Sequence, residues 1–347
     1  MKLAILSRKG SFSDGWIDYC QRQEIPFVEL SPYDSDIMEK IADCDAVLWH
    51  HHHANEKDRL FAKQLLYSIE QSGKQVFPDF KTGWHFDDKL GQKYLLEGIE
   101  APLVPSYAFY DKKTALEWAN STTFPKVFKL RGGAGSSNVM LVRSKREAVK
   151  LIKRCFGKGF KELEYWKTLK YQWEKYRSGL ISFKNLLNIS IATARQYIKS
   201  VNNREHGYAY FQEFMPENKF DFRIVVIANQ YALGEKRYTR DCDFRASGSG
   251  KFDYSDIDVK AIELAFRTAK SLQLQSVAFD IIYAPDKTLK IIEMCYGFGT
   301  HGISQSPGYW TSDLMWHGRK GFDFCGWMVE DIIEKIKNEP KDCPFLG

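Results

Sequence analysis

The sequence lacks the features that mark membrane proteins and disulfide-linked proteins. It contains no run of 18 apolar residues, and the apolar run at its start ends at Leu6, which predicts neither a membrane-spanning helix nor the core of a signal peptide. Its seven cysteines are scattered and include no C-x-x-C pair. An odd number of separate thiols favours a reducing compartment, so we expect a cytoplasmic protein with no membrane partner.

Two common nucleotide-binding fingerprints are also missing. The first 80 residues contain no G-x-G-x-x-G, and no G-x-x-x-x-G-K-[ST] occurs in the chain. Fifty basic and 44 acidic side chains leave a net charge of +6, which suits anionic ligands such as nucleotides and carboxylates without indicating nucleic acid. A chain of 347 residues is expected to form two or three lobes that share a cleft.

The first lobe is predicted by short apolar runs that alternate with helical patterns, the rhythm of a parallel α/β sheet. The helical patterns cover residues 15–23, 35–42 and 55–71. The apolar runs cover residues 3–6, 27–30, 46–49 and 76–77. We therefore expect a Rossmann-like domain over residues 1–88.

Two further domains are expected, over residues 89–210 and 211–340, and they keep the fold in the α/β class. A helix over residues 88–97 leads to Pro102 and Pro105, which mark a lobe boundary. Residues 157–207 form a basic, aromatic stretch that we interpret as a mostly helical insertion, and its mixed charges disfavour a nucleic-acid partner. Strands are predicted at 126–130, 139–142, 210–215, 222–227 and 231–233, and helices from 145 and over 258–272.

Two acidic residues are predicted to face each other on one β-hairpin. If the turn is centred between Asp286 and Lys287, Ile281 pairs with Ile292 and Asp280 lies directly opposite Glu293. Like charges at paired positions destabilise a sheet unless a cation or solvent separates them. The hairpin therefore predicts a Mg²⁺ site, with an exposed hairpin end as the alternative.

A glycine-rich loop follows a strand that ends in a lysine. The segment from Lys129 to Asn138 contains three glycines and two serines, and glycines let backbone N–H groups approach phosphate oxygens closely. An ordinary hairpin turn is the alternative. Further along the chain, the strand ending at Pro216 is followed by a dense set of cations, which suits a transferring phosphoryl group but is also compatible with a solvated charged face.

The order of these motifs resembles that of the ATP-grasp ligases, and in particular the RimK-type glutamate ligases and glutathione synthetases. The similarity extends over roughly residues 85 to 300, and the preceding lobe resembles the family's pre-ATP-grasp domain. The resemblance implies two ATP-grasp subdomains that clamp the nucleotide, and it implies ATP and Mg²⁺ as cofactors, with Mn²⁺ as the alternative ion.

The resemblance also assigns roles to individual residues. It implies nucleotide contacts for Lys89, Lys129, Gly132, Gly133, Gly135, Ser136, Gln212, Glu213, Phe214, Met215, Glu217 and Lys236. It implies metal binding by Asp280, Glu293 and Cys295. It implies that Arg223, Arg237 and Arg245 surround the γ-phosphate and the reaction intermediate.

The activity that this resemblance implies is the ATP-dependent joining of a carboxylate to an amine through an acyl phosphate. The substrates would be a small acid and an amine, or a peptide or glycan acceptor, and a homo-oligomer is compatible with this reading. A small-molecule kinase on the same scaffold and a non-catalytic ATP-binding regulator are the alternatives.

The chain departs from the family at one position of the metal motif. The family commonly has E-x-N where this chain has Glu293-Met294-Cys295, and a thiol is a poor ligand for Mg²⁺. A second unusual feature is the run His50-His51-His52-His53 after the third predicted strand, which we interpret as a surface loop near the ligand-binding edge of the sheet.

Overall fold

The computed structural model describes residues 1–133, 138–161, 172–173, 176–177, 182–199, 204–240, 243–246 and 248–338, with only the backbone of 192–199. The chain divides into two compact units. The first consists of Met1–Phe86, Leu95–Pro102 and Glu217–Gly347, and the second of Asp87–Tyr94 and Leu103–Pro216. Three domains are expected from the sequence, but the structure places the first and the last of them in one compact unit.

The first unit begins with the predicted parallel sheet. Its strands are arranged in the order β2-β1-β3-β4, and every neighbouring pair is parallel. The Rossmann-like interpretation of this lobe is therefore confirmed. The elements are β1 (Leu3–Leu6), α1 (Phe12–Arg22), β2 (Phe27–Leu30), α2 (Ile37–Lys40), β3 (Ala46–Leu48), α3 (Glu56–Gln71), β4 (Gln75–Phe77) and α4 (Phe80–Gly83).

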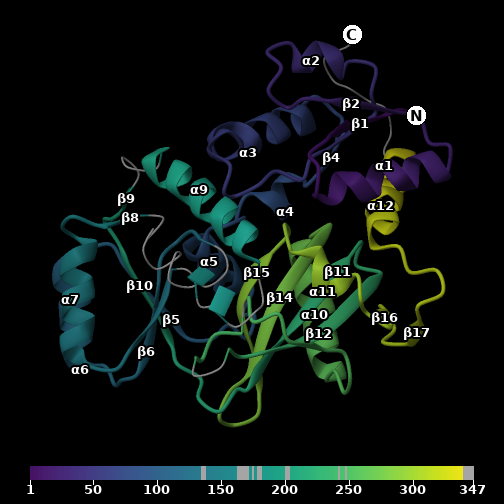
Figure 1. Cartoon of the computed structure of the whole chain (residues 1–347). Coiled ribbons are helices and arrows are strands. Elements are labelled where there is room, and N and C mark those ends of the chain that lie inside the picture. The colour runs from purple at the N-terminus through teal and green to yellow at the C-terminus, as the bar shows by residue number, and fades with distance from the viewer. Residues whose placement is uncertain are drawn as a thin grey trace. The chain divides into compact units, whose positions relative to one another are not determined.

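The second sheet of this unit carries the predicted hairpin. Its strand order is β15-β14-β11-β12-β16-β17, and β13 pairs with β12; Figure 1 shows β11, β12, β14 and β15 side by side. The strands are β11 (Phe220–Ile227), β12 (Tyr231–Tyr238), β13 (Phe252–Asp253), β14 (Ser276–Tyr283), β15 (Leu289–Cys295), β16 (Gly308–Thr311) and β17 (Trp316–Gly318). The expected strand over 231–233 is only the start of β12.

Helix α10 (Val259–Leu272) covers one face of this second sheet, as its apolar spacing predicts. Asp258 caps the start of the helix, where its side chain accepts a hydrogen bond from the Lys260 amide. The apolar side chains of α10, among them Ile262, Ala265 and Ala269, are fully buried. The opposite face of the sheet is thereby left for other contacts.

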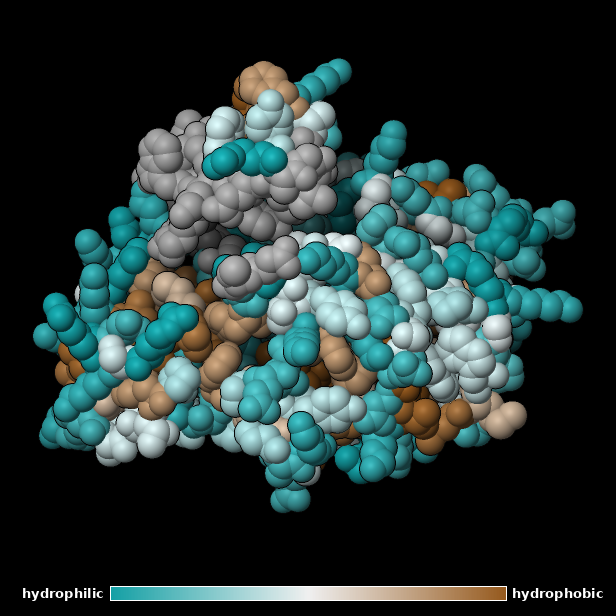
Figure 2. Space-filling model, turned by 60° about the horizontal axis from the view of Figure 1, so that its bottom comes forward, coloured by the Kyte–Doolittle hydropathy of each residue, from teal (hydrophilic) through white to brown (hydrophobic). Residues whose placement is uncertain are grey.

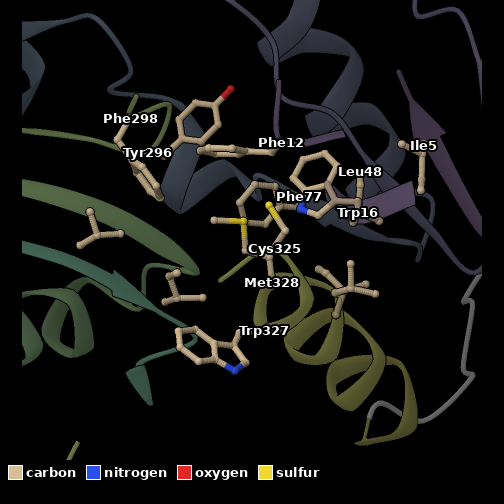
Figure 3. Packing of buried hydrophobic residues seen from close by; sticks show 14 of the residues in the cluster. Ile5, Phe12, Trp16, Leu48, Phe77, Tyr296, Phe298, Cys325, Trp327 and Met328 are labelled. Carbon is tan, nitrogen blue, oxygen red and sulfur yellow. The ribbon is translucent and has the colours of Figure 1, made fainter. Parts of the chain in front are cut away.

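A single hydrophobic core explains why the two sheets form one unit. It contains Leu48 and Phe77 from the first sheet, Val225 from the second, and Met328 from α12 (Phe324–Asn338). Figure 3 shows Phe12, Trp16 and Phe77 beside the sulfur-containing residues Cys325 and Met328 of this core. Helix α12, which the sequence interpretation did not identify, packs against α1 and so completes the N-terminal lobe with C-terminal residues.

The second unit is built around an antiparallel sheet of order β5-β10-β6-β7. Helices α6 and α7 lie next to each other (Figure 1), and their apolar faces share a core with Phe128 and Phe211 of the sheet. The elements are α5 (Lys89–Gly98), β5 (Ser106–Phe109), α6 (Lys112–Ser121), β6 (Lys126–Lys129), β7 (Val139–Val142), α7 (Lys145–Cys155) and β10 (Ala209–Glu213).

The expected insertion at 157–207 is described only in part. Its ends form the paired strands β8 (Phe160–Lys161) and β9 (Arg204–Glu205), and α9 (Phe183–Lys199) lies between them in the sequence. Within the described part of the chain, no helix combines the length and apolarity needed to cross a membrane. On the face shown in Figure 2, hydrophilic side chains project along the outline, and hydrophobic residues show between them.

Candidate functional site

The hairpin of β14 and β15 places the two predicted acids opposite each other. Asp280 pairs with Glu293, as the sequence predicts, but Ile281 pairs with Ile291 rather than with Ile292. The register shifts between Asp280 and Ile281, which is the signature of a β-bulge. The predicted register is therefore wrong near the turn and correct at the two acids. Ile292 is the extra residue of β15, and it brings Glu293 back into line with Asp280.

Six charged side chains share one half of a sheet face. Asp221 pairs with Arg237, and Arg223 pairs both with Glu235 on one side and with Asp280 on the other. Paired residues point to the same side of a sheet, as do residues two apart on a strand. This face is apolar further along, where Val225, Leu233 and Ala278 enter the core. The charged half of this face therefore borders a buried, rigid hydrophobic core.

The charges alternate in sign across three strands. Arg237 donates to both carboxylate oxygens of Asp221, at 2.8 and 2.6 Å, and its Nη2 lies 2.7 Å from Asp280 Oδ2. Arg223 donates to both oxygens of Asp280, at 2.9 and 3.1 Å. Arg237, Asp221 and Asp280 are all buried. Such bidentate pairs fix the guanidinium planes and keep buried charges compensated.

The surroundings shift the pKa values of Asp280 and Asp221 in opposite directions. Burial raises the pKa of Asp280, but the two guanidiniums of Arg223 and Arg237 outweigh it and lower that pKa to about 2. For Asp221, burial dominates and raises the pKa, although Arg237 opposes the shift. Asp280 thus remains a carboxylate at neutral pH, as a metal ligand must.

Glu235 is a member of the site that the sequence interpretation missed. It is buried, and its Oε2 forms no hydrogen bond with any described residue. Burial raises its pKa to about 7, although Arg223 and Arg237 act against the shift. The sequence predicts this strand only over residues 231–233. If the strand is continued beyond Leu233, the alternation of side chains places the Glu235 carboxyl on the same face as Leu233 and Arg237.

Two predicted cations do not lie on this face. Lys236 follows Glu235 on β12 and pairs with Phe222 in the register, so it points to the side covered by α10. Its Nζ lies 3.9 Å from Asp253 Oδ2 and 5.4 Å from the centroid of the Phe220 ring. Arg245 lies in the segment between β12 and β13, where its Nη2 is 2.6 Å from Asp243 Oδ2.

The second unit carries the predicted lysine and glutamine on one face of its sheet. Lys129 pairs with Tyr210 and Gln212 pairs with Val127, on the side opposite to Phe128 and the helical core. Both polar side chains are buried, and the Gln212 amide nitrogen donates to the Ser106 hydroxyl at 3.0 Å. This face therefore presents polar groups that are held in fixed positions.

Glu213 points to the other side of that sheet. Its carboxylate accepts a hydrogen bond from Tyr107 at 2.9 Å and lies 2.8 Å from the buried Lys126 ammonium. Its amide donates to the Pro105 carbonyl. The Glu213 carboxylate therefore binds Tyr107 and Lys126 on the helical side of the sheet. It does not share a face with the Gln212 side chain, because adjacent residues of a strand point to opposite sides.

The glycine loop is connected to the start of α5. The Gly133 amide donates to Asp87 Oδ1 at 2.7 Å, and the Lys89 ammonium donates to the Gly133 carbonyl at 3.0 Å. A Cβ atom at Gly132 would lie 3.1 Å from Asp87 Oδ2. One loop amide is thus already oriented toward an anionic oxygen, the geometry that a phosphate requires. Gly135 and Ser136 lie outside the described residues.

Three of the predicted nucleotide contacts lie, in the sequence, at the junction between the two units. Phe214 and Met215 are half-buried residues after β10, and Glu217 is exposed, with a φ of 66°. The break between the two units falls between Pro216 and Glu217.

The histidine run is not the surface loop that the sequence interpretation expected. His50 and His51 are buried, and His50 Nδ1 accepts a hydrogen bond from the Phe12 amide at 3.1 Å. Burial lowers the pKa of both imidazoles, to about 3 for His51. The expectation failed because residues following β15 cover the run: the Tyr296 hydroxyl donates to the His51 carbonyl at 3.2 Å.

The donor set of the hairpin fits Mg²⁺ that is carried by a nucleotide. Among the described residues, no group of three or more histidines, cysteines or acids forms a complete metal cage. Magnesium is typically held by one or two carboxylates together with phosphate oxygens and water. Asp280 and Glu293 at paired positions supply that minimal protein contribution.

Cys295 allows a direct test of the third ligand position. It pairs with Ala278, two residues beyond Glu293 on the same face, and is half-buried. We expect Cys295→Asn to preserve or increase ATP turnover, since an amide oxygen suits Mg²⁺ better than a thiol does. ATP consumption by Cys295→Asn and by the control Cys295→Ala is compared with the wild type. Complete loss in both variants would instead give the sulfur a role of its own.

Comparisons with known proteins identify the fold. The family model of the RimK-like ATP-grasp domain matches residues 181–310. The structure is similar to an ATP-grasp RimK domain protein from Sphaerobacter thermophilus, with a TM-score of 0.59 and 14% identity over 95% of this chain and 99% of that one. The chain has an ATP-grasp fold.

Other ATP-grasp structures support the same fold assignment. The D-alanine–D-alanine ligase of Bacillus anthracis in complex with ATP is 12% identical, with a TM-score of 0.57 over 98% of this chain and all of that one. The ATP-grasp ligase PsnB with a minimal precursor, Mg and ADP is 12% identical, with a TM-score of 0.52 over 97% and 98% of the two chains. No curated protein sequence matches this chain.

Proposed function

We propose that this ATP-grasp protein is an ADP-forming carboxylate–amine ligase. The observation that carries the proposal is the alternating network of Asp221, Arg237, Asp280 and Arg223 beside Glu293. It joins two rigid guanidiniums to the ionised Asp280 carboxylate, which suits a phosphoryl group in transfer. The fold relatives named above include ligases, which favours this reaction class.

The proposed reaction has two displacements. A substrate carboxylate oxygen attacks the γ-phosphorus of ATP, the bond to the β-phosphate oxygen breaks, and ADP leaves. The amine then attacks the carbonyl carbon of the acyl phosphate, inorganic phosphate leaves, and the amine loses a proton as the amide forms. Arg223 and Arg237 would stabilise the negative charge that develops on the phosphoryl oxygens, because their planes are fixed before the reaction begins.

Each unit contributes its own set of groups in this proposal. In the second unit, Lys89, Lys129 and the amides of the glycine loop would bind phosphates, and Gln212 would orient the base. In the first unit, Asp280 and Glu293 would hold Mg²⁺, which neutralises phosphate charge when bound. We propose an acid and an amine as substrates, with a polypeptide among the candidates for either.

Hydroxylamine trapping tests the proposal directly. With MgATP, hydroxylamine and mixtures of carboxylic acids and acidic peptides, the protein is expected to form a hydroxamate in step with ADP, because hydroxylamine intercepts an acyl phosphate. The hydroxamate is measured by its ferric complex and by mass spectrometry. A stable phosphorylated product without hydroxamate would instead identify a kinase, and ATP binding without any ADP would identify a regulator.

A further inference from the structure

Glu235 is a buried acid that has no role in the two displacements described above. The residue is 3% exposed, and its Oε2 forms no hydrogen bond with any described residue. Buried polar groups in proteins nearly always have a hydrogen-bond partner, and a buried carboxyl without one is costly. Titratable groups in such surroundings concentrate at catalytic sites, where a group changes its charge during the reaction. Glu235 is therefore a candidate for such a role.

The cations beside Glu235 are already paired with other acids. Arg223 lies opposite Glu235 in the register of β11 and β12, but its Nε and Nη2 donate to Asp280. Arg237 is two residues further along β12 and binds Asp221 and Asp280. Burial therefore dominates and raises the pKa of Glu235 to about 7, against the two arginines and with the two aspartates adding to the rise.

The two oxygens of the Glu235 carboxyl have different surroundings. A Cβ atom at Gly302 would overlap Oε2 and would lie 2.9 Å from the carboxyl carbon, so Oε2 is the oxygen that packs against the backbone of α11 (Thr300–Ile303). The same Cβ atom would lie 3.0 Å from Cε1 of Phe252, which places that ring nearby. Oε2 thus packs against carbon atoms that cannot donate a hydrogen bond, and Oε1 is the oxygen directed to other contacts.

The turn that packs against Oε2 is held by a tyrosine. The Tyr254 hydroxyl donates to the Gly302 carbonyl at 2.6 Å. Burial, and after it the charge of Glu235, raises the pKa of Tyr254 to about 12, so this donor keeps its proton while Glu235 titrates. His301, the titratable residue of α11, is exposed, and its ring centroid lies 6.1 Å from that of Phe252. The packing of Oε2 therefore does not depend on pH in the neutral range.

We propose that Glu235 is the general base of the second displacement, a catalytic residue that takes a proton from the ammonium form of the amine substrate. The inference rests on the proposed function and deepens it, because it assigns a group to the step in which the amine attacks. A protonated amine has no lone pair and cannot attack an acyl phosphate. A general base works best when its own pKa is close to the working pH.

The spacing of the strands suits this role. Glu235 on β12, Arg223 on β11 and Asp280 on β14 lie at paired positions. Neighbouring strands are about 4.8 Å apart, so the backbones of β12 and β14 are roughly 10 Å apart. An acyl phosphate bound by Arg223 would lie between the two acids, with its phosphate toward Asp280 and its carbonyl carbon toward Glu235. The amine and its base would then meet on the side of β12.

The protons and bonds of the proposed step balance. Amide formation removes two protons from the nitrogen of a primary ammonium group. The first proton passes to Glu235 and frees the lone pair that attacks the carbonyl carbon. The second leaves the nitrogen after the C–N bond has formed, and it passes to the phosphate as the bond between the carbonyl carbon and the phosphate oxygen breaks. Glu235 then releases its proton to water.

Two nucleophiles of nearly the same size test the proposal in the full-length protein. Hydroxylamine is largely unprotonated at neutral pH, whereas methylamine is almost entirely protonated and needs a base. With MgATP and the acid mixtures described above, the wild type is expected to form hydroxamates from one and N-methylamides from the other. Glu235→Gln should form hydroxamates within about twofold of the wild type and N-methylamides on the order of 10²-fold more slowly, as loss of a general base predicts. Mass spectrometry measures both products.

The pH profile distinguishes a base from a residue that only maintains the structure. N-methylamide formation by the wild type is expected to rise up to about pH 7, as Glu235 ionises, and then to level off. In Glu235→Gln it should follow the fraction of free methylamine, so that the two proteins converge at alkaline pH. The hydroxamate profiles of the two proteins should coincide.

A matched pair of glycine variants tests the surroundings of Oε2. Gly302→Ala places a methyl group where Oε2 lies, whereas a Cβ atom at Gly299, just before α11, would meet nothing within 4 Å. Gly302→Ala is expected to lower N-methylamide formation at least tenfold more than hydroxamate formation, and Gly299→Ala to keep both rates within twofold of the wild type. Equal N-methylamide rates in the two variants would contradict the proposal.

The remaining outcomes are also decisive. An unchanged N-methylamide rate in Glu235→Gln, or an equal loss of both products, would refute the role of Glu235 as a base. So would a wild type that forms hydroxamates but no N-methylamide. Absence of hydroxamate from the wild type is a different result, because it would refute the ligase itself and the base with it.

Discussion

Glu293→Gln is expected to lower the rate of ATP consumption by on the order of 10²- to 10³-fold. Glu293 pairs with Asp280 across the hairpin and would supply one of only two carboxylates for Mg²⁺. The glutamine side chain has nearly the same shape but no charge, so the loss would reflect weakened metal binding. A metal ion contributes several kcal/mol of charge stabilisation in phosphoryl transfer, and each tenfold in rate corresponds to about 1.4 kcal/mol.

The measurement is ADP release under the conditions of the hydroxylamine assay, together with calorimetric titration of MgATP. Glu263→Gln is the matched control, because Glu263 is an exposed carboxylate of α10, which covers the other face of the same sheet. Glu263→Gln should retain the wild-type rate. Wild-type ADP release and wild-type MgATP affinity in Glu293→Gln would remove the hairpin from the mechanism.

Arg237→Met is expected to lower the free energy of unfolding by about 3 to 5 kcal/mol, the cost of breaking a buried ion pair. Arg237 is 4% exposed and lies between Asp221 and Asp280. Its replacement leaves two buried carboxylates near each other, with Arg223 as the guanidinium that remains on Asp280. Urea unfolding measures the change. ADP formation should also fall, since the same guanidinium is proposed to stabilise the phosphoryl group.

The effect of Arg237→Met on stability is expected to depend on pH. In the wild type, Asp280 has a pKa lowered to about 2 from 3.8, so its stabilisation is present above about pH 4 and is lost as the pH falls toward 2. In the variant, Asp221 loses the main cation that opposes burial and Asp280 keeps only Arg223, so the pKa values of both acids rise. Groups with raised pKa values lose stability as the pH rises, so the gap between the two proteins should widen from about pH 4 to pH 7.

Arg22→Met is the control for this measurement. Arg22 forms ion pairs with Asp18 and Asp323, but its side chain is 49% exposed. Exposed ion pairs contribute little to stability because water and salt screen them, so Arg22→Met is expected to lower the free energy of unfolding far less than Arg237→Met does. A loss in Arg22→Met that equals the loss in Arg237→Met would show that the buried network adds no stability of its own.

The local elements of this protein are encoded by local patterns. The apolar spacing of α10, its Asp258 cap, and the alternating runs of the first sheet predict the observed elements closely. The pairing of Asp280 with Glu293 also follows from the hairpin, since strand periodicity relates neighbouring strands across a short turn. These features depend on residues that are near in sequence, which is why they can be read without coordinates.

Contacts between distant segments decided the rest. Nothing near His51 in the sequence indicates that Tyr296 will cover it, and nothing in the first 88 residues indicates that α12 completes their core. A pocket in the second unit is lined by residues of α7, of β7 and by Arg204, which come from separated positions in the sequence. The sequence alone determined the fold class and the acidic hairpin, whereas burial, shared cores and surface concavities arose only from tertiary packing, because they depend on which distant side chains exclude water together.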